Sequence, residues 1–393
     1  MPSSGAWLRL TALGAAAATL LAVVSGAAGL GATHRVLSAL ALPPLVALVL
    51  AGRFSRPRLL VPSLVAVAVF GAAALATEHV VHIALAAVAF AATSVVCALT
   101  FRGDPLPSGS WRDYVTLTKP RIMTLLLLTG ACGYVVGARG IGSVTTFAAT
   151  MLGLALACGG ASALNHVLDA DIDRVMGKRT SSRPVAAGRL EPGRALEFGL
   201  ALSATSFVLL ASAVNVLTAA LALAGNLFYV LVYTRWLKRS TPQNIVIGGA
   251  AGAVPPLVGW AGATGNITVS ALLLFLIVFF WTPPHFWALA LLIKDAYADA
   301  RVPMLPVVEG ERETARQIVL YTIAMIAVTL LPVAFGTLGL LYASAAVALG
   351  VAFLWLAWPL RGQVTKPRAA LVFHFSLLYL ALLFVAAAAD AVL

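Results

Sequence analysis

Residues 269–291 read VSALLLFLIVFFWTPPHFWALAL, a long run without a single charged side chain. An α-helix rises about 1.5 Å per residue, so about 20 apolar residues cross the hydrocarbon core of a bilayer. The rest of the chain has the same character, because 61% of its 393 residues are hydrophobic and only 10% are charged. Soluble proteins carry about 25% charged residues. The sequence therefore predicts an all-α, polytopic membrane protein.

Working outward from this run, we expect about thirteen transmembrane helices in two groups. About four lie in residues 1–105, which we predict to be a four-helix membrane domain, and about nine lie in residues 111–393. The first group is 7–30, 36–51, 59–76 and 80–100. The second is 122–138, 143–164, 196–213, 215–233, 245–262, 269–291, 317–336, 339–359 and 370–390. We interpret the first apolar stretch as a span, because it is too long for a cleaved leader.

The basic residues indicate how these spans are oriented. If the chain starts in the cytoplasm and the spans alternate, all of the 26 Lys and Arg residues except Arg35 and Arg139 fall on the cytoplasmic side. Cytoplasmic loops are enriched in Lys and Arg, so the net charge of +12 reports topology and does not indicate nucleic-acid binding. We expect a bacterial plasma-membrane protein whose N-terminus is cytoplasmic.

The acidic residues number only 14, and two groups of them follow predicted spans. Asn165, Asp169 and Asp173 are four residues apart, so on a helix their side chains form one stripe. Asp295 and Asp299 form a second pair with the same spacing. Both groups are expected at the cytoplasmic membrane surface, and we expect Asp169 and Asp295 to lie near water.

Like charges four residues apart repel on a bare helix, but a divalent cation can bind between them. Carboxylate oxygens suit Mg²⁺, which commonly binds together with substrate phosphates. Asp171 lies off the stripe and is interpreted as a solvated residue or one that supports the site. The candidates for holding phosphate oxygens are the basic residues of the same face: Lys119, Arg121, Arg174, Arg179, Arg183, Lys238, Arg239 and Lys294. The pattern predicts a Mg²⁺-diphosphate site, the alternative being solvated loop charges.

Four runs of sequence carry a resemblance to a known family: residues 119–121 (KPR), 165–184, 233–262 and 281–306. At these runs the chain resembles the UbiA-type intramembrane prenyltransferases, and within them the enzymes that farnesylate protohaem. The resemblance begins near residue 111. It implies a nine-helix bundle that joins farnesyl diphosphate to the 2-vinyl group of haem B. The product is haem O, the precursor of the haem A of terminal oxidases.

The resemblance also assigns residues. Asn165, Asp169 and Asp173 match the family's first Mg²⁺-diphosphate motif, and Asp295 and Asp299 match the second, so these five are the candidate metal ligands and catalytic residues. The haem-enzyme runs favour haem B as acceptor. Two alternatives stay open: a quinone precursor or other aromatic acceptor on the same fold, and a haem carrier or transporter that makes no bond.

The histidines are candidates for contacts with haem. His285 lies inside the span 269–291, and an imidazole at membrane depth is a functional candidate. It would contact haem through the iron or a propionate, or it is a hydrogen-bonded core residue. We interpret His166 as a solvated or supporting residue beside Asn165, and His374 as structural.

Residues 1–105 lie outside the farnesyltransferase resemblance. His34 and His82 start two parallel spans and are expected at similar depth on the outer side, as a bis-histidine haem requires. This segment also resembles one four-helix half of haem A synthase, whose histidines ligate haem. We expect either a second haem here or an extra membrane domain with interfacial histidines. The expected partners of the chain are farnesyl diphosphate, haem B, the lipid bilayer and haem A synthase.

Overall fold

The computed structural model describes residues 4–27, 31–54, 59–75, 79–100 and 109–393. The regular elements of these residues are helices, which confirms the all-α fold. The long helices are α1 (Ser4–Ala27), α2 (Gly31–Phe54), α3 (Leu60–Leu75), α4 (His79–Thr100), α6 (Pro120–Ala138), α7 (Val144–Leu168), α10 (Pro192–Ala213), α11 (Val216–Leu227), α13 (Asn244–Thr264), α14 (Val269–Leu292), α17 (Gly310–Ala334), α18 (Leu340–Ala357) and α19 (Lys366–Val392). The short elements are α5 (Trp111–Leu117), α8 (Ala170–Val175), α9 (Lys178–Ser181), the π-helix η2 (Phe228–Leu237), α12 (Lys238–Ser240), α15 (Lys294–Asp299), α16 (Leu305–Val308) and the 3₁₀ helix η3 (Trp358–Arg361).

The predicted spans match these helices. Within the described residues, 11 helices are long and apolar enough to cross a bilayer, and shorter apolar stretches at Leu60–Ala74 and Val88–Cys97 lie in α3 and α4. Local sequence sets several helix starts. The side chains of Ser143 and Asn215 accept hydrogen bonds from the backbone N–H groups of Thr146 and Thr218, which caps α7 and α11.

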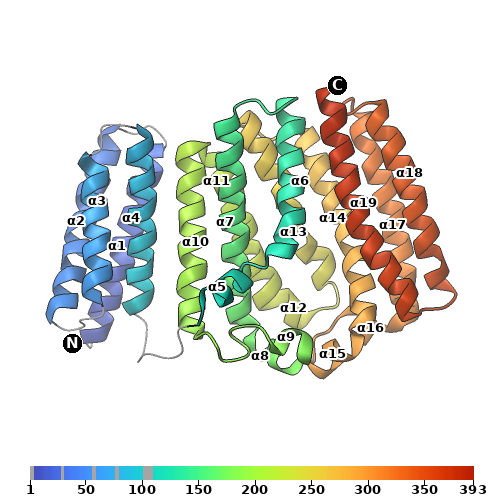
Figure 1. The fold of residues 1–393 in the computed structure, drawn as a ribbon, viewed down its shortest axis with the longest axis horizontal. Coiled ribbons are helices and arrows are strands. Elements are labelled where there is room, and N and C mark those ends of the chain that lie inside the picture. The colour runs from blue at the N-terminus through green and yellow to red at the C-terminus, as the bar shows by residue number, and fades with distance from the viewer. Residues whose placement is uncertain (1–3, 28–30, 55–58, 76–78, 101–108) are drawn as a thin grey trace.

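The N-terminal helices α1–α4 form a bundle of their own (Figure 1). Its centre contains Ala12, Leu45, Leu48, Ala66 and Val96, all buried. Helix α4 packs against α10, which belongs to the nine long helices that follow. The expected boundary between the two groups falls in residues 101–108, outside the described residues, so the division into two domains stays a prediction.

The short helices α5, α8, α9, α12, α15 and α16 gather at one end of the molecule, the lower end in Figure 1. We call this the basic end, because Lys119, Arg183, Lys238, Arg239 and Arg301 lie on or beside these helices. Both predicted acidic groups are there, since the first follows α7 into α8 and the second is on α15. The expectation that the two groups share one face of the molecule therefore agrees with the fold.

Asp113 holds helix α5 at the basic end. Its Oδ2 accepts hydrogen bonds from the backbone N–H and the hydroxyl of Ser110, each at 2.9 Å. Its Oδ1 accepts a hydrogen bond from Arg189 Nε at 3.0 Å. The bond from the Ser110 backbone is the main cause that lowers the pKa of Asp113. Because the pKa of Asp113 is lower in the folded chain than in the unfolded chain, its ionised carboxylate stabilises the fold. This stabilisation is complete above the pKa of the unfolded chain, near pH 4, and is lost as the pH falls through the pKa of the folded chain.

We expect Asp113→Ala to lower the free energy of unfolding by about 1 kcal/mol at pH 7. The gap between wild type and variant should narrow on acidification below about pH 4. Thermal unfolding of both proteins in detergent at neutral and acid pH measures this gap. An equal gap at both pH values would contradict the carboxylate's role.

Candidate functional site

A buried polar cluster joins α6, α7 and α12 at the basic end. Asn165 Oδ1 accepts a hydrogen bond from Lys119 Nζ at 2.8 Å, and Asn165 Nδ2 donates to Asp169 Oδ2 at 2.8 Å and to Thr234 Oγ1 at 3.0 Å. Asp169 Oδ2 also accepts from Lys238 Nζ at 2.5 Å. Asn165 and Asp169 are 3% and 1% exposed. The spacing of four residues brings these two side chains into direct contact.

Asp173 extends the cluster through a different cation. Arg183 Nη1 donates to Asp173 Oδ1 at 2.7 Å and to Oδ2 at 2.9 Å. The hydroxyl of Thr180 donates to the backbone carbonyl of Asp173 at 2.8 Å, which fixes the loop after α8. Asp173 is 1% exposed.

Two features of this cluster differ from the sequence-based expectation. The stripe was expected on one continuous helix, but α7 ends at Leu168 and α8 begins at Ala170, so the chain bends at Asp169. Asp169 was also expected near water, and this is wrong, because the bend directs its carboxylate into the bundle, where Lys238 neutralises it. Asp295, in contrast, is exposed as expected.

The cluster has a surplus of positive charge. Three cations, Lys119, Arg183 and Lys238, bind an asparagine and only two carboxylates. Burial, reinforced by Arg183, lowers the pKa of Lys119 to about 7, so its amino group is fully protonated at neutral pH only when an anion joins it. Lys238 is buried and Lys119 and Arg183 are partly buried, and removing charges from water is costly unless a counter-charge joins them. The cluster is therefore suited to accept an anion.

The donor set also fits a hard cation. Asp169 Oδ1 is buried and accepts no hydrogen bond, and Arg239 Nη2 is 3.9 Å away from it. A buried carboxylate oxygen without a donor is suited to a metal ligand role, and the amide and carboxylate oxygens of Asn165, Asp169 and Asp173 are the types that Mg²⁺ prefers. Within the described residues, however, no three Asp, Glu, His or Cys side chains lie close enough together to coordinate one metal ion.

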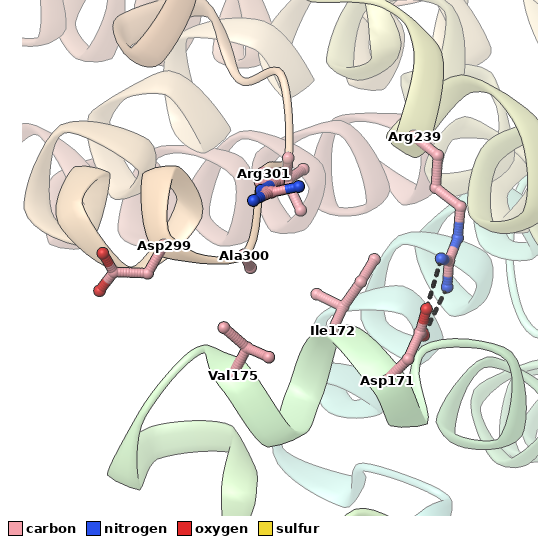
Figure 2. A pocket seen from close by; sticks show the side chains of 8 residues that line it. Asp171, Ile172, Val175, Arg239, Asp299, Ala300 and Arg301 are labelled. Carbon is pink, nitrogen blue, oxygen red and sulfur yellow. Dashed lines mark hydrogen bonds and ion pairs between the residues drawn. The ribbon is translucent and has the colours of Figure 1, made fainter.

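A pocket of about 440 Å³ opens beside the cluster, between α8 and the end of α15 (Figure 2). On its α8 side Asp171 accepts two hydrogen bonds of 2.7 Å from the guanidinium of Arg239. These bonds lower the pKa of Asp171 to about 2. Asp171 was interpreted as a solvated or supporting residue; its side chain is 63% exposed and forms this bidentate ion pair at the pocket.

The second acidic pair belongs to α15, on the other side of the pocket from Asp171 of α8. Asp299 lines the pocket, and Asp295 is exposed on the same short helix. Figure 2 shows the Asp299 carboxylate pointing away from the Asp171–Arg239 pair. The structure thus brings both predicted motifs to the basic end without bringing their carboxylates together. Their shared role in metal binding stays a prediction.

The other predicted phosphate-binding residues are more scattered. Lys294 pairs with Glu311 at 3.2 Å, outside the cluster. Arg174 and Arg121 are exposed, and Arg174 Nε donates to the Ala186 carbonyl at 3.4 Å. The side chain of Arg179 lies outside the described residues.

His285 is a buried core histidine in this structure. Its Nδ1 is 2.6 Å from Ser376 Oγ, and its ring stacks against Trp281 and Phe373 with centroids 4.3 and 5.0 Å away. The Ser376 hydroxyl donates to the Phe373 carbonyl, so Nδ1 of His285 carries the proton and donates to Oγ. These contacts agree with the structural interpretation, and a haem contact of His285 stays a prediction.

A family model described as the UbiA prenyltransferase family matches residues 126–383. The chain belongs to the UbiA prenyltransferase family. Over 286 residues it is 51% identical to protoheme IX farnesyltransferase 1 of Pseudomonas fluorescens (strain Pf-5), a match that covers 72% of this chain and 94% of that protein. It is 52% identical over 281 residues to the protoheme IX farnesyltransferase of Roseiflexus sp. (strain RS-1), covering 72% of this chain but only 52% of the relative. The chain thus spans about half the length of that relative.

Two solved structures share the fold of this UbiA family member. A digeranylgeranylglyceryl phosphate synthase aligns with a TM-score of 0.59 at 18% identity, covering 72% of this chain and 98% of the other. A UbiA homologue from Archaeoglobus fulgidus bound to DMAPP and Mg²⁺ aligns with a TM-score of 0.52 at 18% identity, covering 70% and 98%. The nine-helix bundle is therefore the UbiA fold.

Two residues of the site were not among the predicted site residues. Thr234 accepts the hydrogen bond from Asn165 and lies in η2, a π-helix that the hydropathy of span 215–233 could not reveal. Arg301 lines the pocket with a left-handed backbone (φ 52°), and Lys119 has a similar φ of 50°. Left-handed backbone is unusual for residues other than glycine and gathers at functional sites. The sequence did contain a signal for Arg301, because this basic residue follows Asp299 by only two positions.

Proposed function

We propose that this chain transfers the farnesyl group of farnesyl diphosphate to the 2-vinyl group of haem B, which yields haem O. The observation that carries the proposal is the group of three cations around Asn165, Asp169 and Asp173, one buried and two partly buried, because it is suited to an anion such as a diphosphate. The names of relatives about 50% identical to the chain support farnesyl as the donor group and protohaem as the acceptor.

In this proposal Lys119, Arg183 and Lys238 bind the phosphate oxygens and stabilise the charge that develops on the leaving diphosphate. Mg²⁺, held by the first acidic group together with Asp295 and Asp299, would supply further positive charge at that group. Arg183 and Lys238 bind carboxylates in the present structure. If Asp173 and Asp169 held Mg²⁺, Arg183 and Lys238 would be available to bind the substrate phosphates.

The bond changes balance with water as the one further co-reactant. The farnesyl C–O bond breaks and its electron pair leaves with the diphosphate. The π-electrons of the haem vinyl group form the new C–C bond to the allylic carbon, which leaves a cation beside the porphyrin ring. Water adds to this cation and loses a proton, giving the hydroxyethyl-farnesyl group of haem O. The apolar helices exclude water from the allylic cation until the C–C bond has formed.

Incubation of the purified chain with farnesyl diphosphate, Mg²⁺ and haem B tests the proposal, with mass spectrometry of the extracted haems as the measurement. We expect haem O to form in proportion to released diphosphate, and a chelator to stop the reaction. Transfer to a quinone precursor and not to haem B would identify the alternative acceptor. Haem binding without any diphosphate release would instead indicate a carrier.

We also propose that the basic end faces the cytoplasm of a bacterium, in its plasma membrane. The segregation of Lys and Arg supports this orientation. Haem A synthase is then the proposed partner, because an enzyme that oxidises haem O must receive this product. Protease accessibility of the loops at each end, in inside-out and right-side-out vesicles, measures the orientation.

We propose a second function for the N-terminal bundle, the binding of a haem by His34 and His82. Their ring centroids are 5.9 Å apart at an interplanar angle of 77°. Two nitrogens that each lie about 2 Å from one shared metal place the ring centroids about 6 Å apart. The pair is thus spaced as two ligands of one ion would be.

The tautomers of the two rings also suit metal binding. Nδ1 of His34 is 2.7 Å from the Ala22 carbonyl, and Nδ1 of His82 is 2.7 Å from the Ala73 carbonyl. A carbonyl only accepts, so both Nδ1 atoms carry the proton and both Nε2 lone pairs stay available, as in metal-bound histidines. Two imidazoles complete the ligand set of an iron that brings four porphyrin nitrogens.

We expect the purified full chain to show a low-spin, bis-histidine haem spectrum that is absent from His34→Ala and His82→Ala. His374→Ala is the matched control, because His374 also bonds a backbone carbonyl, Ala370 O, but is exposed and remote from the pair. Absorbance titration with haem B gives the stoichiometry. Equal haem binding by all four proteins would show that the two histidines are only interfacial.

A further inference from the structure

His166, interpreted above as a solvated or supporting residue, lies on the face of α7 that packs against the loop leading to Lys119. Positions 159, 162 and 166 share one face of α7. On this face a Cβ at Gly159 would meet Thr118 at 3.3 Å, and Ser162 Oγ donates to the Leu117 carbonyl at 2.6 Å. His166 is the next residue along the same face, one turn closer to the basic end, and only 2% of it is exposed.

Neither ring nitrogen of His166 has a hydrogen-bond partner. The other four histidines whose side chains the structure describes each bond through Nδ1 to a carbonyl or a hydroxyl. A neutral imidazole carries one N–H donor and one acceptor, and burying both without partners is unfavourable. A ligand that accepts a hydrogen bond would relieve part of this cost.

The charges around His166 decide what that ligand is. Lys119 donates a hydrogen bond of 2.8 Å to Asn165, the residue next to His166, and the charges of Lys119 and Arg183 both bear on the His166 ring. Two nearby cations disfavour a metal ion at the imidazole and favour an anion with acceptor oxygens. They are also two of the three cations that the proposed function assigns to the diphosphate.

We propose that His166 is a further substrate-binding residue, which donates a hydrogen bond from its ring N–H to a phosphate oxygen of the prenyl diphosphate. This inference rests on the proposed function. Lys119 and Arg183 supply charge, while His166 supplies a directed donor on the rigid helix α7. The residue thereby fixes how the diphosphate is oriented among the cations, and the neutral ring suffices for this role.

Binding of inorganic pyrophosphate with Mg²⁺ to the full chain tests the proposal, measured by the rise in unfolding temperature at increasing pyrophosphate. A ligand that binds only the folded chain raises this temperature according to its affinity. We expect His166→Leu to bind pyrophosphate about 10–100-fold more weakly than wild type, since a hydrogen bond to a charged group is lost. His166→Gln, whose side-chain amide offers a donor near the position of Nε2, or His166→Asn, which offers one near Nδ1, should recover most of the affinity.

Ser162→Ala is the matched control, because it disturbs the same face of α7 without removing a donor from the anion site. It should lower the unfolding temperature without ligand but keep the affinity for pyrophosphate. The KM for farnesyl diphosphate should rise in His166→Leu, while haem binding stays unchanged. Native pyrophosphate affinity in His166→Leu would overturn the role of His166 alone. Absence of pyrophosphate binding and of haem O formation in wild type would instead overturn the proposed function, and the role of His166 with it.

Discussion

The double substitution Asp169→Asn with Lys238→Met is expected to leave the chain folded and to lower farnesyl transfer by about 10²–10³-fold. Asp169 and Lys238 form a buried ion pair of 2.5 Å, so replacing both removes the two charges together. Neutral replacements of a buried pair are often tolerated by the fold. The reaction, however, loses a proposed metal ligand and a proposed phosphate-binding cation at once.

The single variant separates the fold from the chemistry. Asp169→Asn alone leaves Lys238 buried without its carboxylate and should cost about 3–5 kcal/mol of stability. The double variant should recover most of that loss but none of the activity. Glu313→Gln, at an acid of the same end that pairs with Arg316 and Gln317, is the control and should retain native turnover.

Initial rates of haem O formation and the unfolding temperature of each variant provide the two measurements. A stable double variant with near-native turnover would show that the metal and diphosphate sites lie elsewhere. An unstable one would show that the ion pair is mainly structural, and the exposed Asp295 then becomes the better position for testing the metal site.

The fold was predictable because span length and charge are local properties of the sequence. Each predicted span corresponds to a helix, and the family comparison confirms the UbiA bundle. The contact between Asn165 and Asp169 was predictable for the same reason, since a spacing of four residues brings side chains together on a helix turn.

Burial was harder to predict than position. Asp169 was placed correctly at the end of a span, but its bend into the bundle depends on Lys238, which is 69 residues away in sequence. Thr234 joins Asn165 through a π-helix that no hydropathy pattern encodes. The sequence did not single out His166, because the burial of its unpartnered ring nitrogens depends on how α7 packs against the loop leading to Lys119. Long-range packing decided all three.

The second large effect is expected at the crossing of α6 and α13. A Cβ at Gly259 of α13 would overlap the Gly130 carbonyl oxygen of α6 and come within 2.8 Å of the Tyr134 nitrogen. A second close approach lies one turn before Gly259 in α13, where a Cβ at Gly133 of α6 would meet the backbone of Pro256. Small residues permit such backbone contact between membrane helices. The atoms in the way are backbone atoms, so no side chain can rotate to make room.

We therefore expect Gly259→Ala to cost at least about 3 kcal/mol, at the upper end of overpacking effects. Gly252→Ala is the matched control in the same helix, because a Cβ there meets nothing within 4 Å. It should be neutral or stabilising by up to about 1 kcal/mol, since alanine favours helix more than glycine. Unfolding temperature and monodispersity in detergent compare the two variants.

The same crossing links the fold to the site. Lys119 is the residue from which α6 starts, so a displaced α6 moves its ammonium group away from Asn165. Any Gly259→Ala protein that still folds should therefore bind pyrophosphate more weakly than Gly252→Ala. If Gly259→Ala keeps both the stability and the pyrophosphate affinity of the control, then the two helices are not in backbone contact, and Lys119 is positioned by α5 and α7 instead.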